Sequence, residues 1–148
     1  MLIDKARIRE LIPHTGAMCL LDTVIAWDDD SIQCVTDTHR DSANPLRRRG
    51  RLPAVVAFEY GAQAAAVHGG LRASAAGESA APGYLAALRN ACWFVSELDE
   101  NAAPLEVTAH RLLGEAAHCI YAIQISSAGQ LLAEARITIV PQTHGKSP

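Results

Sequence analysis

One acidic side chain stands out because of its neighbours. Glu59 lies in the segment 53–71, PAVVAFEYGAQAAAVHGGL, whose other residues are mostly apolar or small. Burying a carboxylate among such groups is costly unless it is paired or neutral, and a partly desolvated carboxyl is suited to proton transfer near neutral pH. We therefore predict that Glu59 is a catalytic acid or base. The alternative is that it points to a hydrated face or pairs with an arginine of the preceding loop.

Two further polar residues follow in the same segment. Gln63 lies one helical turn after Glu59 and either bonds its carboxylate, at the edge of a substrate site, or is a buried amide bonded to backbone. His68 comes nine residues after Glu59, which puts it on the opposite helix face and roughly 13 Å away along the axis. A direct Glu59–His68 pair is therefore not expected, and the helix dipole alone would favour a histidine near the helix end.

The loops supply other candidate bases. His14 precedes the first apolar strand-like run, and His39 begins the polar loop that leads to the 53–71 segment. Each is either a catalytic base or a structural histidine. No two histidines have metal-ligand spacing, so the sequence predicts no metal and no cofactor.

A basic run precedes the predicted helix and is either a solvated loop or a docking site. It consists of Arg47, Arg48, Arg49 and Arg51. In the second case the partner is anionic, either an acyl carrier protein or the phosphates of coenzyme A. The helix start adds unpaired backbone N–H groups, from about Ala54 through Val55 to Val56, that can polarise a carbonyl or stabilise an oxyanion.

The elements that must position these residues follow from periodicity and turn signals. We predict a helix over 4–12, strands over 18–27 and 31–38, a buried helix over 53–71 ended by Gly69-Gly70, a connector over 72–83, strands over 84–96, 104–113, 117–126 and 130–140, and a disordered tail over 141–148. One antiparallel sheet of about six strands around one helix, as a single domain over 1–140, satisfies this order. One sheet cannot cover the helix on all sides, so we expect a dimer.

Composition excludes several classes. The 148 residues carry a net charge of −3, which gives no sign of nucleic-acid binding. No apolar run has the length of a signal peptide or a membrane span, so we expect a cytoplasmic protein. The four cysteines are scattered in apolar runs, which predicts buried core residues rather than disulfides or a zinc site.

Three blocks of the chain resemble the hotdog-fold 3-hydroxyacyl-acyl-carrier-protein dehydratases of fatty-acid synthesis. They are IRELIPHTGAMCLLDTV, LPAVVAFEYGAQAAA and YLAALRNACWFVSELDE, and LLAEARITIV is similar to the family's last strand. The resemblance covers residues 8–140 and places the family's catalytic acid on Glu59. It implies removal of water from a 3-hydroxyacyl thioester, with Glu59 assisting departure of the hydroxyl, a histidine taking the C2 proton, and a tunnel lined by Leu88 and Phe94.

The chain departs from that family at one position. The family's catalytic histidine, in a block just before the helix, falls on about Pro45 here, and the segment ANPLRRRGRLP has no histidine. This segment is similar to a divergent branch found with aryl-polyene pathways. The resemblance implies His14 as the first substitute and His39 as the second, with Asn44 positioning a carbonyl.

Two other functions stay open. One is an acyl-thioester hydrolase, because the same fold can use a helix carboxylate to activate water or attack the thioester. The other is a non-catalytic subunit that binds the carrier or stabilises an active relative, which the missing histidine favours. The expected assembly is accordingly a homodimer or a heterodimer with a related dehydratase.

Overall fold

The computed structural model describes residues 2–13, 16–78, 83–114 and 118–141. Its helices are α1 (Lys5–Leu11) and α2 (Ala57–Ala75), with short 3-10 turns η1 (Gly16–Met18), η2 (Thr38–Arg40) and η3 (Ala54–Val56). Its strands are β1 (Thr23–Trp27), β2 (Ser31–Thr36), β3 (Gly83–Trp93), β4 (Leu105–Gly114), β5 (Cys119–Ser127) and β6 (Gln130–Pro141). The order of elements is the one expected from the sequence.

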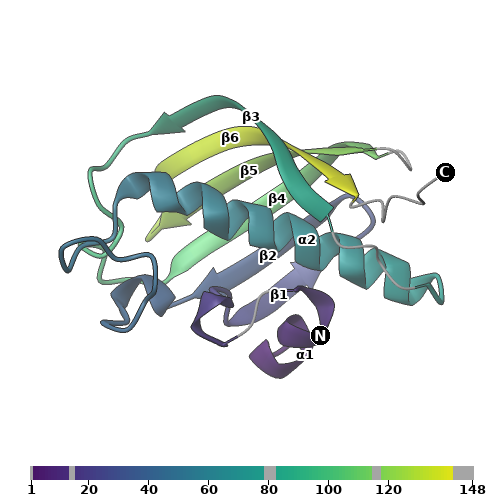
Figure 1. The fold of residues 1–148 in the computed structure, drawn as a ribbon, viewed down its shortest axis with the longest axis horizontal. Helices are drawn as coiled ribbons and strands as arrows, with labels where there is room; N and C mark the ends of the chain where they lie inside the picture. Colours follow the sequence, from purple (N-terminus) through teal and green to yellow (C-terminus); the bar gives the residue numbers. More distant parts are fainter. Residues whose placement is uncertain (1, 14–15, 79–82, 115–117, 142–148) are drawn as a thin grey trace, which may run out of the picture.

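The six strands form one antiparallel sheet in the order β1-β2-β4-β5-β6-β3. The sheet curves around α2, which crosses its concave face (Figure 1). β4, β5 and β6 follow one another as a meander, whereas the chain passes through α2 before β3 joins the far edge beside β6. The predicted fold, an antiparallel sheet of about six strands around one long helix, is confirmed.

Local chemistry explains where several elements begin and turn. Asp4 caps α1, because its side chain accepts a hydrogen bond from the Arg7 N–H at 3.0 Å. The turn between β1 and β2 forms around Asp28, whose Oδ1 accepts from the N–H groups of Asp30 and Ser31 at 2.8 Å. Such side-chain acceptance is why Asp favours turns.

α2 is buried on most of its surface, as its composition predicts, but it does not end at Gly69-Gly70. The helix continues to Ala75, and the predicted end is wrong. A Cβ at Gly70 would lie 3.1 Å from the Leu11 carbonyl oxygen and 3.2 Å from its Cβ. This glycine therefore lets α1 approach α2 closely, and Gly77, with φ +74°, follows the actual helix end.

One other prediction needs correction. Residues 18–22 were expected in a strand, but β1 begins only at Thr23. The backbone of this segment bonds elsewhere: the Cys19 N–H donates to the Gly16 carbonyl at 3.2 Å, and the Leu20 N–H donates to a side chain of α2. The predicted disorder of 141–148 concerns residues that, apart from Pro141, lie outside the described ranges.

The cysteines divide into two pairs, all recorded as free thiols. Cys19 and Cys34 are buried, as predicted, and burial raises the pKa of Cys34 to about 12. Cys119 is half-buried and Cys92, on the edge strand β3, is exposed, so the prediction of four buried cysteines is wrong for these two. Cys92 lies opposite Glu134 of β6 and so projects from the outer face of this edge strand, which explains its exposure.

Candidate active site

The start of α2 is held by the segment that follows β3. The Ala54 N–H donates to the Ser96 carbonyl at 3.0 Å, and the Leu98 N–H donates to the Leu52 carbonyl at 2.9 Å. The predicted free amides therefore divide. The Ala54 N–H has an internal acceptor and the Val56 N–H donates to the Pro53 carbonyl at 3.0 Å, whereas the N–H of Val55 belongs to a helical start, where intrahelical acceptors are missing. Val55 is also 54% exposed.

An ion-pair network fixes the loop before α2. Arg51 contacts Glu97, and also Asp99 at 3.0 Å and Glu100 at 2.9 Å. Burial alone would raise the pKa of Asp99, but the Leu52 N–H hydrogen bond and the nearby arginine charges lower it. Arg51 is thus neutralised by acidic residues of its own chain and serves to hold the loop.

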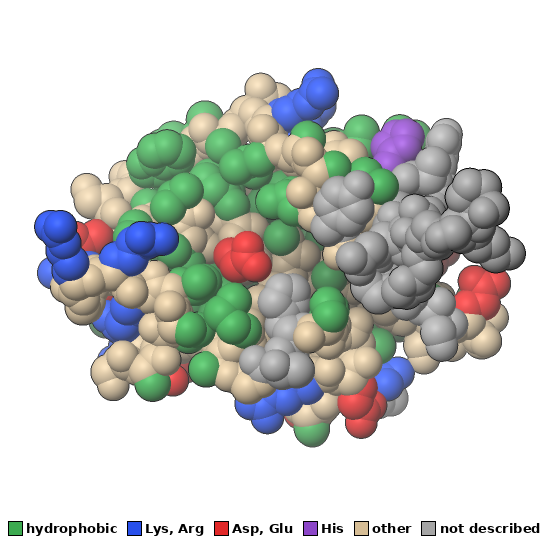
Figure 2. Space-filling model, viewed as in Figure 1, with side chains coloured by type: hydrophobic (Ala, Val, Ile, Leu, Met, Phe, Trp, Pro, Cys, Tyr) green, Lys and Arg blue, Asp and Glu red, His purple; other side chains and the backbone are tan. Residues whose placement is uncertain are grey.

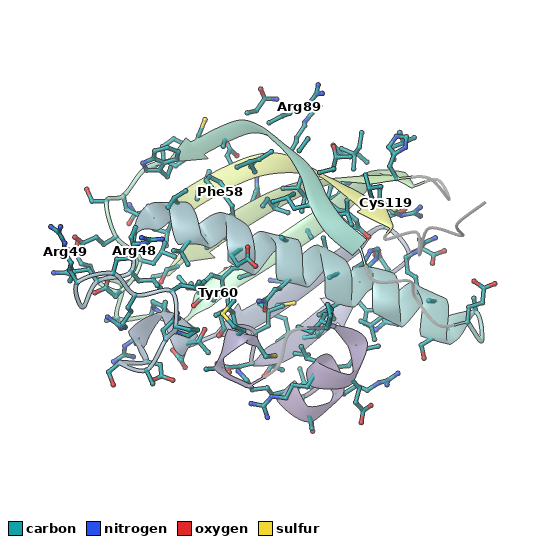
Figure 3. The ribbon with its side chains drawn as sticks, in the orientation of Figure 1. Arg48, Arg49, Phe58, Tyr60, Arg89 and Cys119 are labelled. Atoms are coloured by element: carbon teal, nitrogen blue, oxygen red, sulfur yellow. The ribbon has the colours of Figure 1, made fainter. Side chains whose placement is uncertain are left out.

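The four arginines of the basic run therefore fall into two groups, one engaged within the chain and one accessible. Arg47 donates to the carbonyls of Asp41 at 2.7 Å and Gly50 at 2.8 Å, and its side chain is only 15% exposed. Arg48 and Arg49 are exposed at the tip of the loop (Figure 3). The structure therefore leaves Arg48 and Arg49 accessible, whereas Arg47 and Arg51 are engaged within the chain.

Glu59 is half-buried and lies in the first turn of α2. Between Glu59 and Gly69, the other partly exposed positions of the helix recur at three- and four-residue spacing and are all small. They include Ala62, Ala66 and Gly69. This spacing puts them on one face with Glu59, so the open face of α2 carries a carboxylate at one end and a shallow stripe of small residues beyond it.

Large apolar side chains flank this open face. Leu85, Leu88 and Trp93 of β3 lie opposite Ile139, Ile137 and Ala133 of β6 and so project from the core side of the sheet. They are 41%, 41% and 54% exposed. Figure 2 shows hydrophobic side chains gathered over the β3 side of α2.

Aromatic residues continue this surface toward the start of the helix. The ring of Trp93 packs edge-on against the ring of Phe58, with the two ring centroids 6.2 Å apart. The neighbouring Phe94 is 56% exposed. Leu88 and Phe94, the predicted tunnel-lining residues, are therefore accessible in the single chain. In this chain the apolar surface beside α2 is open rather than enclosed.

Gln63 bonds backbone rather than Glu59 in the hydrogen bonds that are described. Its Oε1 accepts from the Leu20 N–H at 2.9 Å, and its Nε2 donates to the Met18 carbonyl at 2.7 Å. Of the two interpretations of this residue, the structure shows the buried amide. Gln63 thereby fastens residues 18–20 to the helix one turn after Glu59.

The sequence does not predict the hydroxyl network around Tyr60, the residue after Glu59. The Tyr60 hydroxyl shares a hydrogen bond of 2.8 Å with the Thr38 hydroxyl and accepts one of 3.1 Å from the Asn44 amide. The same Asn44 amide donates to the Thr38 carbonyl, and its Oδ1 accepts from the Leu46 N–H. Burial raises the pKa of Tyr60. Asn44 thus holds the loop against α2, and no spacing rule links residues this far apart.

Of the two loop histidines, the structure describes His39 and not His14. His39 is fully buried, and its Nε2 donates to the Asn101 carbonyl at 2.9 Å. Burial lowers the pKa of His39, which keeps the ring neutral. Its described contact is with the loop before β4, and a catalytic role for it stays a prediction. His14 lies outside the described residues.

His68 is buried on the far side of the helix and takes part in structure. Its Nε2 lies 2.7 Å from the Asp28 carbonyl and must donate to it. In the neutral ring Nδ1 is then an acceptor, and it accepts from the Tyr121 hydroxyl at 2.7 Å. Burial lowers the pKa of His68 despite the Asp28 hydrogen bond. The expectation that His68 would not pair with Glu59 agrees with these partners.

Stability should therefore fall when His68 is protonated. The unfolded residue titrates near pH 6.5, and the folded one titrates lower, so below about pH 6.5 the unfolded chain binds more protons. We expect the unfolding free energy to decrease from pH 7.5 to 5, by at most about 1.4 kcal/mol per pH unit per histidine. Urea unfolding of the His68→Gln variant should show a shallower pH dependence, and an unchanged slope would contradict this assignment.

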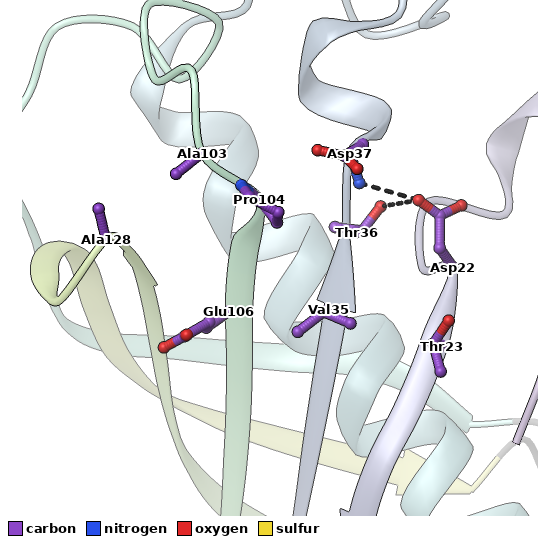
Figure 4. A pocket seen from close by; sticks show the side chains of 9 residues that line it. All are labelled: Asp22, Thr23, Val35, Thr36, Asp37, Ala103, Pro104, Glu106 and Ala128. Atoms are coloured by element: carbon purple, nitrogen blue, oxygen red, sulfur yellow. Dashed lines mark hydrogen bonds between the residues drawn. The ribbon is translucent and has the colours of Figure 1, made fainter. Parts of the chain in front are cut away.

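A cavity of about 390 Å³ lies away from Glu59. Its lining comes from the ends of β1, β2 and β4 and includes Asp22, Thr36, Asp37 and Glu106 (Figure 4). Asp22 is already engaged there, by Lys5 at 2.8 Å and the Asp37 N–H at 2.8 Å. None of the predicted site residues lines this cavity.

The described part of the chain offers neither a metal cluster nor a membrane-spanning helix. It contains no group of three or more His, Cys, Asp or Glu side chains arranged to hold a metal ion. Within the same ranges, none of the helices combines the length and the apolar character needed to cross a bilayer.

A six-stranded antiparallel sheet curved around one long helix is the hotdog fold, and the helix carboxylate beside an open apolar face matches the dehydratase pattern found in the sequence. The fold and site therefore define a hotdog-fold dehydratase. This chain belongs to the ApeP-like family, whose model, described as ApeP dehydratase, matches residues 6–147. The predicted family and dehydratase function are thereby confirmed.

Solved structures agree with this assignment. The chain is similar to one from the dehydratase heterocomplex ApeI:P of Xenorhabdus doucetiae, with 25% identity and a TM-score of 0.84 over 93% of this chain and 91% of that one. A putative thioesterase from Shewanella oneidensis shares the fold, with 14% identity and a TM-score of 0.63 over 92% and 95% of the two chains. No curated protein matches the chain.

Proposed function

We propose that this protein removes water from a 3-hydroxyacyl thioester, carried by an acyl carrier protein, to give the 2-enoyl thioester. The observation that carries the proposal is the position of Glu59, half-buried on the open face of α2 with small residues beyond it. A carboxyl at this place can reach a bound substrate, and the small side chains leave room for an extended acyl chain. The family assignment supports the same chemistry.

The proposed reaction divides the proton transfers between two groups. His14 takes the proton from C2, and the C2–H electron pair forms the C2–C3 double bond. The C3–O bond breaks, and the hydroxyl leaves as water with a proton from Glu59. The N–H of Val55 polarises the thioester carbonyl, which makes the C2 proton more acidic. Return of the proton from the histidine to Glu59 restores the site.

We further propose that a second hotdog subunit completes this site, with a related dehydratase as the favoured partner. The large apolar side chains beside α2 are exposed in the single chain, and no strand of the described residues pairs with the outer edge of β3. Exposed apolar patches and unpaired strand edges both favour association. The Xenorhabdus doucetiae protein is named as part of a dehydratase heterocomplex, which supports a non-identical partner over a second copy.

The function is tested by offering the protein two thioesters, alone and together with a related dehydratase. One substrate is a 3-hydroxyacyl carrier thioester and the other is the matching saturated thioester. A dehydratase produces 2-enoyl absorbance from the first and releases no thiol from either. Thiol release from the saturated thioester would instead indicate the hydrolase. If the related dehydratase turns over the substrate at the same rate with and without this chain, the chain neither catalyses the reaction nor activates its partner.

Carrier docking is proposed for Arg48 and Arg49, because these two members of the basic run are exposed. Replacing both by alanine should weaken carrier binding, measured by titration calorimetry, by about tenfold and more strongly at low salt, because exposed charges are screened by salt. Arg51→Ala serves as a contrast, since it removes an ion-pair network and should lower the melting temperature instead. Unchanged carrier affinity in the Arg48/Arg49 double variant would rule out this surface.

A further inference from the structure

The free edge of β3 combines an apolar side with a charged side. Leu85, Leu88 and Trp93 project toward the α2 side of the sheet, as their partners on β6 show, because Ile137 and Ala133 are buried and Ile139 packs against the core. Arg89 lies opposite Arg136, and both are exposed. Arg136 adjoins the buried Ile137, and alternation along a strand therefore puts both arginines on the outer face of the sheet. Figure 3 shows Arg89 on β3, pointing away from α2.

Arg89 and Arg136 are like charges in directly opposed positions, an arrangement that weakens strand pairing. The nearest acidic residue on the same face of β6 is Glu134, which lies opposite Cys92. Among the described residues, neither arginine has an ion pair with a carboxylate. The chain therefore keeps two positive charges together at the outer face of its free edge.

A symmetric partner would increase this repulsion. β3 runs from Gly83 to Trp93, and its middle residue is Leu88. If two copies paired antiparallel along this whole strand, Leu88 would lie on the two-fold axis and the two Arg89 side chains would be diagonal neighbours. Such neighbours are about 7–8 Å apart, which is within the Debye length of roughly 10 Å at 0.1 M salt. Four arginines would then share one stripe.

We propose that Arg89 selects a non-identical hotdog subunit, one whose facing strand presents a carboxylate to the Arg89–Arg136 pair. The inference rests on the proposed assembly through β3 and specifies its partner. The apolar side of the strand supplies attraction that any hotdog edge can share, whereas the charged side distinguishes an acidic partner strand from a second copy. Specificity of this kind comes from penalising the wrong partner as well as stabilising the right one.

The test uses this chain alone. Sedimentation equilibrium at low salt compares the wild type with Arg89→Met and with Arg9→Met, a matched change at an exposed arginine on α1. Arg89→Met should tighten self-association about tenfold, the combined effect of several like-charge neighbours, and Arg9→Met should not. Raising the salt concentration should tighten self-association of the wild type. A mixture of wild type and Arg89→Glu should associate more tightly than wild type with itself.

Hydrogen exchange of residues 83–93 in the same samples locates the contact. Protection of this strand in the mixed pair is the expected result. If residues 83–93 are protected in none of the samples, the proposed edge-to-edge assembly is wrong, and so is the charge selection inferred from it. If the strand is protected but Arg89→Met behaves like Arg9→Met, or the mixed pair is no tighter than the wild type, only the charge selection is wrong.

Discussion

Replacing Glu59 by glutamine should lower the dehydration rate by about 10²–10⁴-fold, the usual contribution of a positioned general acid. The amide keeps the size and hydrogen-bonding reach of the side chain but cannot supply the proton that the leaving hydroxyl needs. Since Glu59 is only half-buried in α2, the substitution should leave the melting temperature within a few degrees of the wild type. The measurement is the appearance of 2-enoyl thioester absorbance with the assembled complex.

A matched control is available at the other end of the same helix. Glu78, just past the end of α2, is exposed, and Glu78→Gln removes the same charge without approaching the site. It should retain full activity. Activity of Glu59→Gln within threefold of Glu78→Gln would show that this carboxyl does not transfer the proton. The chain would then act as a supporting subunit of an active relative.

Two glycines of α2 should respond in opposite directions to the same substitution. A Cβ at Gly61 would lie 2.9 Å from the Cβ of Ile123 on β5 and closer still to its Cδ1. Because the helix and the sheet are in contact there, Gly61→Ala should destabilise the protein by about 1–3 kcal/mol. A Cβ at Gly69 would meet nothing within 4 Å. Gly69→Ala should therefore stabilise the helix by up to about 1 kcal/mol.

Urea unfolding of both variants at one pH measures the difference directly. Equal stabilities would mean that α2 and β5 are further apart than the structure places them. The comparison also separates packing from helix propensity, because both sites lie inside the same helix and both changes add one methyl group. Measuring the single chain at low concentration avoids any contribution from association at the open face that carries Gly69.

The fold was predictable because each element has a local signature. The alternation in 31–38 and 130–140, the acidic turn at Asp28 and the long apolar helix each identify one part of a hotdog domain. The errors have a common cause in tertiary contacts. Gly70 was interpreted as a stop signal, but it accommodates Leu11. Residues 18–20 look like a strand, but their backbone bonds the Gln63 side chain.

The candidate site was only partly accessible from the sequence. Glu59 was found because a carboxylate in an apolar helix is conspicuous. The run of arginines was recognised as a whole, yet the division between engaged Arg51 and exposed Arg48 depends on residues 97–100, far along the chain. The hydroxyl of Tyr60 is likewise partnered by a loop whose path only the folded structure reveals.

The position of β3 at the far edge of the sheet has a consequence for synthesis of the chain. Among the described strands it pairs with β6, which comes last in chain order, so several dozen residues must leave the ribosome after β3 before this pair can form. At a synthesis rate of about 5–20 residues per second, this apolar strand remains without its pairing strand for a few seconds. The interval exposes it to chaperones, or to a partner already folded nearby, before its own sheet can close.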